Sequence, residues 1–142
     1  MEVHYKLSEG YLVALRAVHM EAVTTESPAL GQEVGKQLAR LPEDTATLLL
    51  RHTTAKEVGF TWSSSLSYIG SYVGNYEDAK RAYLTYPGYG LLNLSGGYNW
   101  RFGDRQFYIG VALRNALDRD LLATNARVGA DRTLSISMRT IF

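Results

Sequence analysis

The chain has 142 residues, of which 46% are hydrophobic and 20% charged, and its formal net charge is +1. This composition excludes an intrinsically disordered chain, and the near-neutral charge gives no electrostatic basis for binding nucleic acid. The absence of cysteine excludes a disulfide framework and a thiolate metal site. Ten tyrosines favour β-strands and membrane interfaces, and no apolar run reaches the roughly 18 residues that a membrane-spanning helix needs.

Alternation of apolar and polar residues predicts seven β-strands. They cover residues 1–7, 11–21, 45–52, 58–72, 89–102, 106–115 and 132–142. The second strand alternates poorly. The last strand alternates most clearly, with Leu134, Ile136, Met138 and Phe142 on one face and mainly serines and an arginine on the other.

The connections between these strands alternate in length. The short ones are residues 8–10, 53–57 and 103–105. The long ones are residues 22–44, 73–88 and 116–131. A transmembrane β-barrel has this order, with short periplasmic turns and long external loops around strands of about ten residues. The sequence therefore predicts an all-β, antiparallel transmembrane β-barrel segment whose C-terminus lies on the short-turn side.

The two faces of the predicted strands differ in chemistry. In the fifth strand, Leu92, Leu94 and Trp100 share a face opposite Asn93 and Ser95. We interpret the apolar face as lipid-facing and the small polar face as the lumen of a wide barrel. The alternative is a soluble sheet that packs its apolar face on another layer, but the sequence predicts no helix or second apolar sheet as cover.

Several segments resemble those of TonB-dependent receptors. The sequence Asn-Ala-Leu-Asp-Arg at 115–119 is similar to the family's N-L-F-D-K/R segment, and Gly129 to Arg132 resembles the G-x-P-R that follows it. Upstream, residues 35–46 and 86–94 resemble two further strand-initiating motifs of the family, and the final Phe142 resembles its usual end. The chain departs from the pattern at four positions. These are Ala116, Leu117, Leu121 and Asp131.

The resemblance covers nearly all of the chain and implies about seven C-terminal strands of a roughly 22-stranded barrel. Residues 1–142 would then form a partial receptor barrel without its plug and first strands. The first six residues lack the features of a signal peptide, and an odd number of strands does not close a barrel of the usual even kind. We therefore expect a fragment that is not competent for transport alone.

The resemblance also implies a function and partners. It implies uptake of a scarce ligand, such as a ferric siderophore, across the outer membrane of a Gram-negative cell. The partners would be outer-membrane lipid, the rest of the barrel and plug, the TonB complex and the barrel assembly machinery. Two alternatives stay open, namely a passive porin-like or structural barrel and a barrel-embedded enzyme, although the isolated histidines His4, His19 and His52 argue against an active site.

Candidate functional residues fall into four groups. The resemblance singles out Asn115, Asp118, Arg119, Gly129 and Arg132 as family-motif positions. By class resemblance, Leu134, Ile136, Met138 and Phe142 form a C-terminal assembly signal. Strand parity places most of five arginines on the polar face, namely most of Arg16, Arg51, Arg101, Arg114 and Arg139, and the candidates for the lumen are Arg101, Arg114 and Arg139. The loop tyrosines include Tyr76, Tyr83 and Tyr86.

The last two groups each allow two interpretations. The arginines either form a basic lumen for a plug or anionic cargo, or pair across strands with carboxylates. The tyrosines either stack on a ligand or belong to an outer aromatic girdle. No catalytic residue, metal site or cofactor is predicted.

Overall fold

The computed structural model describes residues 1–26, 34–35, 37–54, 58–77, 82–119, 122–123, 127–128 and 131–141. These residues form strands and their connections. The main sheet consists of β1 (Glu2–Ser8), β2 (Tyr11–His19), β3 (Asp44–His52), β4 (Gly59–Ile69), β7 (Tyr89–Phe102), β8 (Arg105–Arg114) and β11 (Thr133–Ile141). In the part of the chain that the structure describes, no helix is long and apolar enough to cross a membrane.

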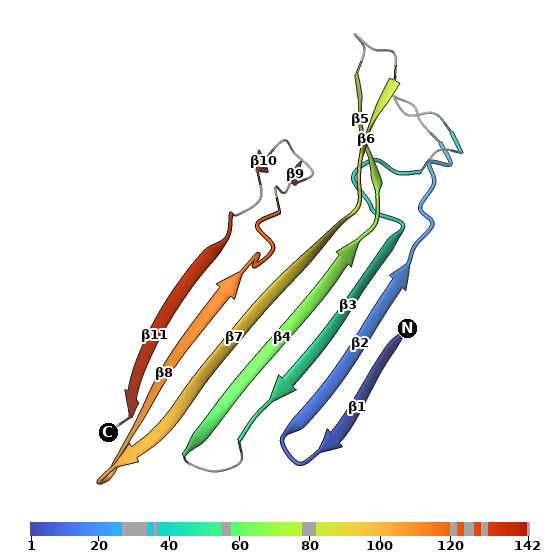
Figure 1. The fold of residues 1–142 in the computed structure, drawn as a ribbon. Helices are drawn as coiled ribbons and strands as arrows, with labels where there is room; N and C mark the ends of the chain where they lie inside the picture. The colour runs from blue at the N-terminus through green and yellow to red at the C-terminus, as the bar shows by residue number, and fades with distance from the viewer. Residues whose placement is uncertain are drawn as a thin grey trace.

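The seven strands form one antiparallel sheet in the order β1-β2-β3-β4-β7-β8-β11 (Figure 1). Strand order follows chain order, so each strand pairs with the main-sheet strand before it. The prediction of seven antiparallel strands is thereby confirmed. Strands β1 and β11 form the two edges of this sheet, which is not closed.

The connections divide between the two ends of the sheet. The last residues of β1, β3 and β7 lie together at one end of the sheet, the short-turn end, and those of β2, β4 and β8 lie together at the other, the long-connection end (Figure 1). Between β7 and β8 only Gly103 and Asp104 remain outside the ladder, because Phe102 pairs with Arg105. Gly103 has a φ of 59°, which a two-residue hairpin turn requires and glycine adopts without strain.

Some predicted boundaries were wrong. Alternation continues through residue 72, but β4 ends at Ile69, and Tyr72 begins a separate hairpin of β5 (Tyr72–Glu77) and β6 (Ala82–Tyr86). The predicted connection 73–88 therefore contains most of this hairpin. The second strand ends at His19 rather than at residue 21, because the pairing of His19 with Asp44 is the last of the β2–β3 ladder.

The predicted connection 116–131 also contains two short pairing segments. These are β9 (Leu122–Ala123) and β10 (Arg127–Val128), which pair with each other and not with the main sheet. The hairpin β5–β6 and the pair β9–β10 lie at the long-connection end (Figure 1). This end of the molecule therefore carries additional structure that alternation alone did not predict.

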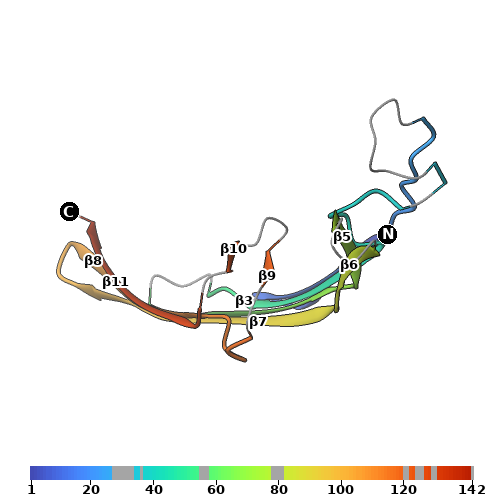
Figure 2. The same ribbon diagram turned by 90° about the horizontal axis from the view of Figure 1, so that it is seen from above.

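The sheet is a single curved layer (Figure 2). Among the described residues, only Ala14 and Tyr72 are buried hydrophobic side chains. Large apolar side chains are instead exposed along the strands, including Phe60, Leu66 and Leu134. A sheet that leaves its apolar face in contact with water gains little from the hydrophobic effect. Among the described residues, no second layer covers this face.

Candidate functional site

The apolar face extends across all seven strands of the sheet. The register places Leu134, Ile136 and Met138 of β11 opposite Leu113, Val111 and Ile109 of β8, so six apolar side chains share one face. Leu134 and Met138 are 64% and 74% exposed. These are three of the residues predicted as an assembly signal, and they lie on an edge strand. Phe142, the fourth, lies outside the described residues.

Aromatic rings form a row on the apolar face near the short turns. The contacts and ring-centroid distances are Tyr11–His52 at 4.2 Å, His52–Trp62 at 6.5 Å, Phe60–Tyr98 at 4.7 Å, Tyr98–Trp100 at 6.3 Å and Trp100–Phe107 at 5.4 Å. Aromatic rings at this level are typical of the membrane–water interface, where the ring is half in lipid. This row was not predicted from the sequence. The sequence feature that indicates the row is that each of these residues lies within a few positions of a short turn.

The opposite face is polar and internally hydrogen-bonded. The hydroxyls of Ser63 and Ser95 lie 2.8 Å apart, and those of Thr47 and Ser67 lie 3.1 Å apart. Each pair joins neighbouring strands at directly opposite positions of the register. Such cross-strand hydroxyl pairs stabilise an antiparallel ladder and leave a hydrophilic surface. Water or a polar partner therefore suits this face.

The register places all five arginines named in the sequence analysis on the polar face. Arg51 is opposite Ser63, Arg114 is opposite Thr133, Arg139 is opposite Tyr108, and Arg16 is opposite Glu2. Arg101 is opposite Gln106, donates from Nε to the carbonyl of Gly103 at 3.0 Å, and has Nη2 3.9 Å from Asp104 Oδ1. Within the ladders of the described residues, Arg16 is the one of these five arginines that lies directly opposite a carboxylate residue.

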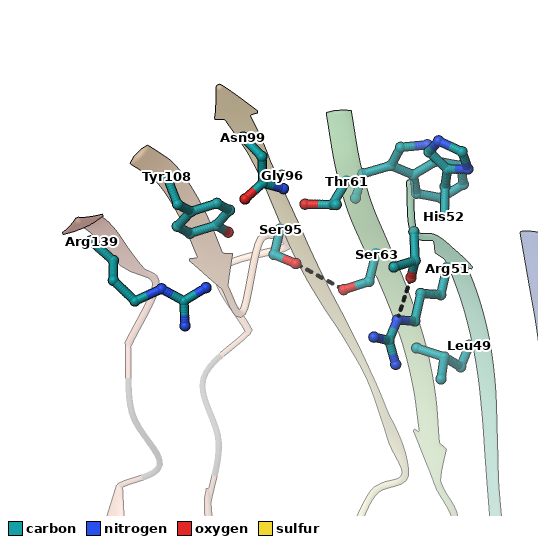
Figure 3. Close-up of a pocket in the computed structure, with 12 residues that line it drawn as sticks. Leu49, Arg51, His52, Thr61, Ser63, Ser95, Gly96, Asn99, Tyr108 and Arg139 are labelled. Atoms are coloured by element: carbon teal, nitrogen blue, oxygen red, sulfur yellow. Dashed lines mark hydrogen bonds between the residues drawn. The ribbon is translucent and has the colours of Figure 1, made fainter. Parts of the chain in front are cut away.

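A pocket of about 500 Å³ lies on the polar face near the short turns (Figure 3). Arg51 and Arg139 stand at opposite sides of it, with Ser63 and Ser95 between them. Arg51 Nε donates to Thr53 Oγ1 at 3.0 Å, and the Arg139 guanidinium lies 5.7 Å from the centre of the Tyr108 ring. Both cationic groups are therefore oriented by neighbours that carry no charge.

The Tyr108 ring at this pocket depends on two glycines. Tyr108 covers Gly97 and Gly110, and a Cβ atom at either glycine would overlap the ring. An aromatic side chain that lies over glycines of its own and the neighbouring strand is a known stabilising device of sheets. The two glycines therefore keep the ring flat against the sheet, in contact with the Arg139 guanidinium.

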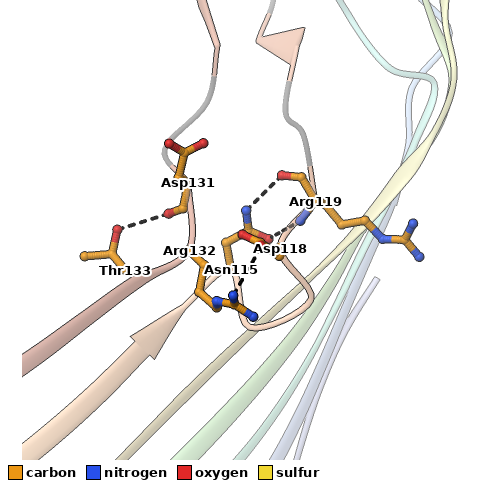
Figure 4. Close-up of polar contacts among 6 residues, drawn as sticks. All are labelled: Asn115, Asp118, Arg119, Asp131, Arg132 and Thr133. Carbon is orange, nitrogen blue, oxygen red and sulfur yellow. Dashed lines mark hydrogen bonds and ion pairs between the residues drawn. The ribbon is translucent and has the colours of Figure 1, made fainter.

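The predicted family-motif residues form a clasp at the opposite end of β8, which we define as Asn115, Asp118, Arg119 and Arg132 (Figure 4). Asn115 is 4% exposed and has a φ of 48°. Its Oδ1 accepts from the Arg119 amide at 3.0 Å, and its Nδ2 donates to the Arg119 carbonyl at 2.9 Å. The Asn115 side chain thus makes the hydrogen bonds to the N–H and the carbonyl of Arg119 that a neighbouring strand would otherwise make.

Two further contacts attach the clasp to its surroundings. The backbone N–H of Asn115 donates to Asn93 Oδ1 on β7 at 3.0 Å. Arg132 Nη2 lies 3.3 Å from Asp118 Oδ2. The ion pair joins the chain just after β8 to the chain just before β11. The clasp therefore fixes how the β8–β11 connection leaves the sheet. Gly129, the remaining predicted motif residue, lies outside the described residues.

The predicted loop tyrosines lie in the β5–β6 hairpin. Tyr76 pairs with Tyr83 in the ladder, although their side chains are outside the described part of the structure. The Tyr72 and Tyr86 rings stack with centroids 5.1 Å apart, and Tyr72 is 5% exposed. Burial raises the pKa of the Tyr72 hydroxyl.

The three histidines lie on different strands. His4 contacts Glu2 at 2.8 Å, His19 contacts Asp44 at 2.8 Å, and His52 is opposite Tyr11 in the aromatic row. Within the described ranges, no group of three or more histidine, cysteine or acidic residues could hold a metal ion.

The curved single-layer sheet, with one apolar face and one polar face, defines a wall segment of a β-barrel. A family model described as the TonB dependent receptor-like β-barrel matches residues 5–116, and the chain belongs to this family. A search by sequence of functionally described proteins finds no match.

The structure is similar to the crystal structure of BauA, the ferric preacinetobactin receptor from Acinetobacter baumannii. The TM-score is 0.73 at 18% sequence identity, and the match covers 96% of this chain. The chain spans about a fifth of BauA, since the match covers 20% of that protein. The shared fold agrees with the barrel-wall geometry described above.

Proposed function

We propose that this chain forms part of the barrel wall of an outer-membrane receptor that takes up a scarce ligand, with a ferric siderophore as the ligand class. The membership of the TonB-dependent receptor-like family supports the receptor role. The ligand class is supported by the similarity to BauA, a ferric preacinetobactin receptor. The wall supplies surface and external loops and carries no reaction.

The observation that carries the proposal is the division of the sheet into two opposite faces. The exposed apolar face, from Leu94 through Ile109 to Ile136, suits lipid, and the hydroxyl-rich face suits a hydrated lumen. The main-sheet strands range from 7 to 14 residues, and a tilted bilayer crossing needs about 9–11. Lipid on one side and water on the other satisfies both faces without a second layer.

Further parts complete the receptor in this proposal. The described sheet has free edges at β1 and β11, and the match to BauA covers a fifth of that receptor. We therefore propose that strands outside residues 1–142 close the barrel, and that a plug fills it. Ligand release into the periplasm would then depend on the TonB complex acting on parts outside this chain.

Uptake measurements test this function. Cells that carry the full-length receptor are expected to accumulate a ferric siderophore under iron limitation, and to stop doing so when the TonB complex is inactivated. Candidate siderophores can be screened as radiolabelled iron complexes, with a strain that lacks the receptor as control. Solute leakage that persists without the TonB complex would instead indicate a passive barrel.

The proposed orientation predicts labelling of one end of the sheet from outside the cell. Cysteine in place of Thr85, on the β5–β6 hairpin, is expected to react with a membrane-impermeant maleimide on intact cells. Cysteine in place of Asp104, in the turn after β7, is expected to react only after the outer membrane is permeabilised. Labelling of position 104 alone on intact cells would reverse the orientation.

The last strand is proposed to carry the assembly signal. Leu134, Ile136 and Met138 lie on one face of the edge strand β11, whose free edge can be captured by strand addition. Deleting Phe142, or the change Phe142→Asp, is expected to reduce the heat-resistant folded form in outer-membrane fractions. The matched control is Thr140→Ser in the same strand. Normal folded yield from both Phe142 variants would contradict an assembly role.

A further inference from the structure

A hollow of about 450 Å³ lies on the apolar face of the sheet, in the half that is nearer to the short turns. Gly96 of β7 forms its floor, because the register places this glycine between Trp62 of β4 and Val111 of β8 on the same face. The rings of Phe60 and Tyr98, with centroids 4.7 Å apart, bound it toward the short turns. We call this feature the Gly96 hollow. Its floor is backbone and its walls are apolar side chains.

The sheet itself does not require glycine at position 96. The φ of Gly96 is outside the left-handed region, and a Cβ atom there would have the Thr61 carbonyl oxygen as its nearest neighbour, at 3.9 Å. At the adjacent Gly97, by contrast, a Cβ atom would overlap the Tyr108 ring. Glycine inside a strand costs conformational entropy and adds no side-chain packing. The effect of Gly96 that the structure shows is therefore the open hollow.

A cation lies on the same face at the short-turn end. Arg105 is exposed and lies directly opposite Phe102, and among the main-sheet residues described on the apolar face it is the one Lys or Arg. The carboxylate of the adjacent Asp104 has its own cationic neighbour, Arg101 Nη2, at 3.9 Å. The charge of Arg105 is therefore out of keeping with the apolar face on which it stands.

The separation of Arg105 from the hollow matches half of a bilayer. Val111 lies six positions after Arg105 on β8. Six residues extend about 20 Å along a strand, which is about 15 Å along the membrane normal for a tilt of about 40°. Half of the hydrocarbon core is also about 15 Å thick. A hollow near the bilayer centre therefore has Arg105 at the level of the lipid headgroups.

We infer that the Gly96 hollow holds one acyl chain of a diacyl phospholipid whose phosphate binds Arg105, an inference that rests on the proposed function. A hollow left empty in the hydrocarbon core would lose the dispersion contacts of its walls, whereas a flexible unbranched chain can lie between Trp62 and Val111. Apolar character alone selects no particular lipid, because all lipid tails are equally apolar. The selection comes from the shape of the hollow and from charge-assisted hydrogen bonds between guanidinium and phosphate.

Photolabelling of the full-length receptor in lipid bilayers tests this inference. The probe is phosphatidylglycerol with a diazirine near the end of one acyl chain, added as a small fraction of the lipid. Mass spectrometry is expected to find the label concentrated on Trp62 and Val111, above the rest of the apolar face. The change G96V fills the hollow and is expected to lower this labelling roughly fivefold. The matched control is G90V, which adds the same side chain to the same face of β7 at its other end and should leave the labelling unchanged.

A second pair of probes tests the role of Arg105. The change R105Q is expected to lower labelling of the hollow by the phosphatidylglycerol probe roughly fivefold. It should not change labelling by the corresponding diacylglycerol probe, which has no phosphate. The control R139Q removes a charge from the polar face and should change neither result.

Four outcomes would overturn the inference. They are label spread evenly over the apolar face, a hollow labelled less than the rest of that face, equal labelling of G96V and G90V, and equal effects of R105Q on the two probes. If G96V does not give the heat-resistant folded band, the distribution of label in the unaltered receptor still decides. A folded receptor with no label anywhere on the apolar face would contradict the proposed barrel rather than this lipid site.

Discussion

Replacing Leu94 with Arg is expected to lower the free energy of unfolding of the barrel in lipid by about 2–4 kcal/mol. Leu94 is exposed on the apolar face in the middle of β7, opposite Leu113. An arginine there would place its charge near the middle of the bilayer, where neither water nor an opposite charge is available. The measurement is urea unfolding of the full-length barrel in lipid vesicles.

Ser95→Arg is the matched control for this substitution. Ser95 follows Leu94 in the chain and is exposed on the polar face, where it pairs with Ser63 at 2.8 Å. The loss of this hydrogen bond costs about 1 kcal/mol, and the new charge would lie in the hydrated lumen. Equal losses of stability at positions 94 and 95 would show that the faces are wrongly assigned.

Asn115→Ala is expected to destabilise the barrel by about 2–4 kcal/mol, because two side-chain hydrogen bonds are lost and Arg119 backbone groups lose their partners. Asn115 also has a φ of 48°, a conformation that asparagine adopts more readily than alanine. The unfolding midpoint in urea measures the effect. Digestion of the β8–β11 connection by added protease should become faster in the same variant.

Asp118→Asn is the control for the clasp. It keeps a residue type that tolerates the φ of 53° at position 118 and removes only the charge of the pair with Arg132. Both partners are half exposed, so the expected loss is below about 1 kcal/mol. If Asp118→Asn destabilises the barrel as much as Asn115→Ala, the ion pair and not the asparagine holds the clasp.

The alternation of residues predicted the strands of the main sheet because a period of two assigns each side chain of a strand to one of two faces. Once Leu134, Ile136 and Met138 share a face, a slip of one residue would turn all of them to the polar side. The pattern therefore excludes a register with β8 that is shifted by one residue, and the structure gives the register itself. The end of β4 did not follow, because Ile69 and Tyr72 both suit a strand and the separate hairpin depends on tertiary pairing between Tyr72 and Tyr86.

The candidate sites were predictable to different degrees. The resemblance identified Asn115 and Arg132 by position, but the side-chain bonds of Asn115 depend on a left-handed backbone that the sequence does not specify. The aromatic row and the Arg51–Arg139 pocket each combine residues from several strands. Their composition depends on the register of all the strands between them, so single-strand patterns could not show it.

The central claim is that the apolar face meets lipid and the polar face meets water. The most direct measurement is a nitroxide scan of residues 107–113 in the full-length receptor, reconstituted in lipid. Collision with oxygen is expected to peak at positions 107, 109, 111 and 113, and collision with a water-soluble nickel chelate at positions 108, 110 and 112, with a period of two. Reversed maxima, or the absence of that period, would contradict the account.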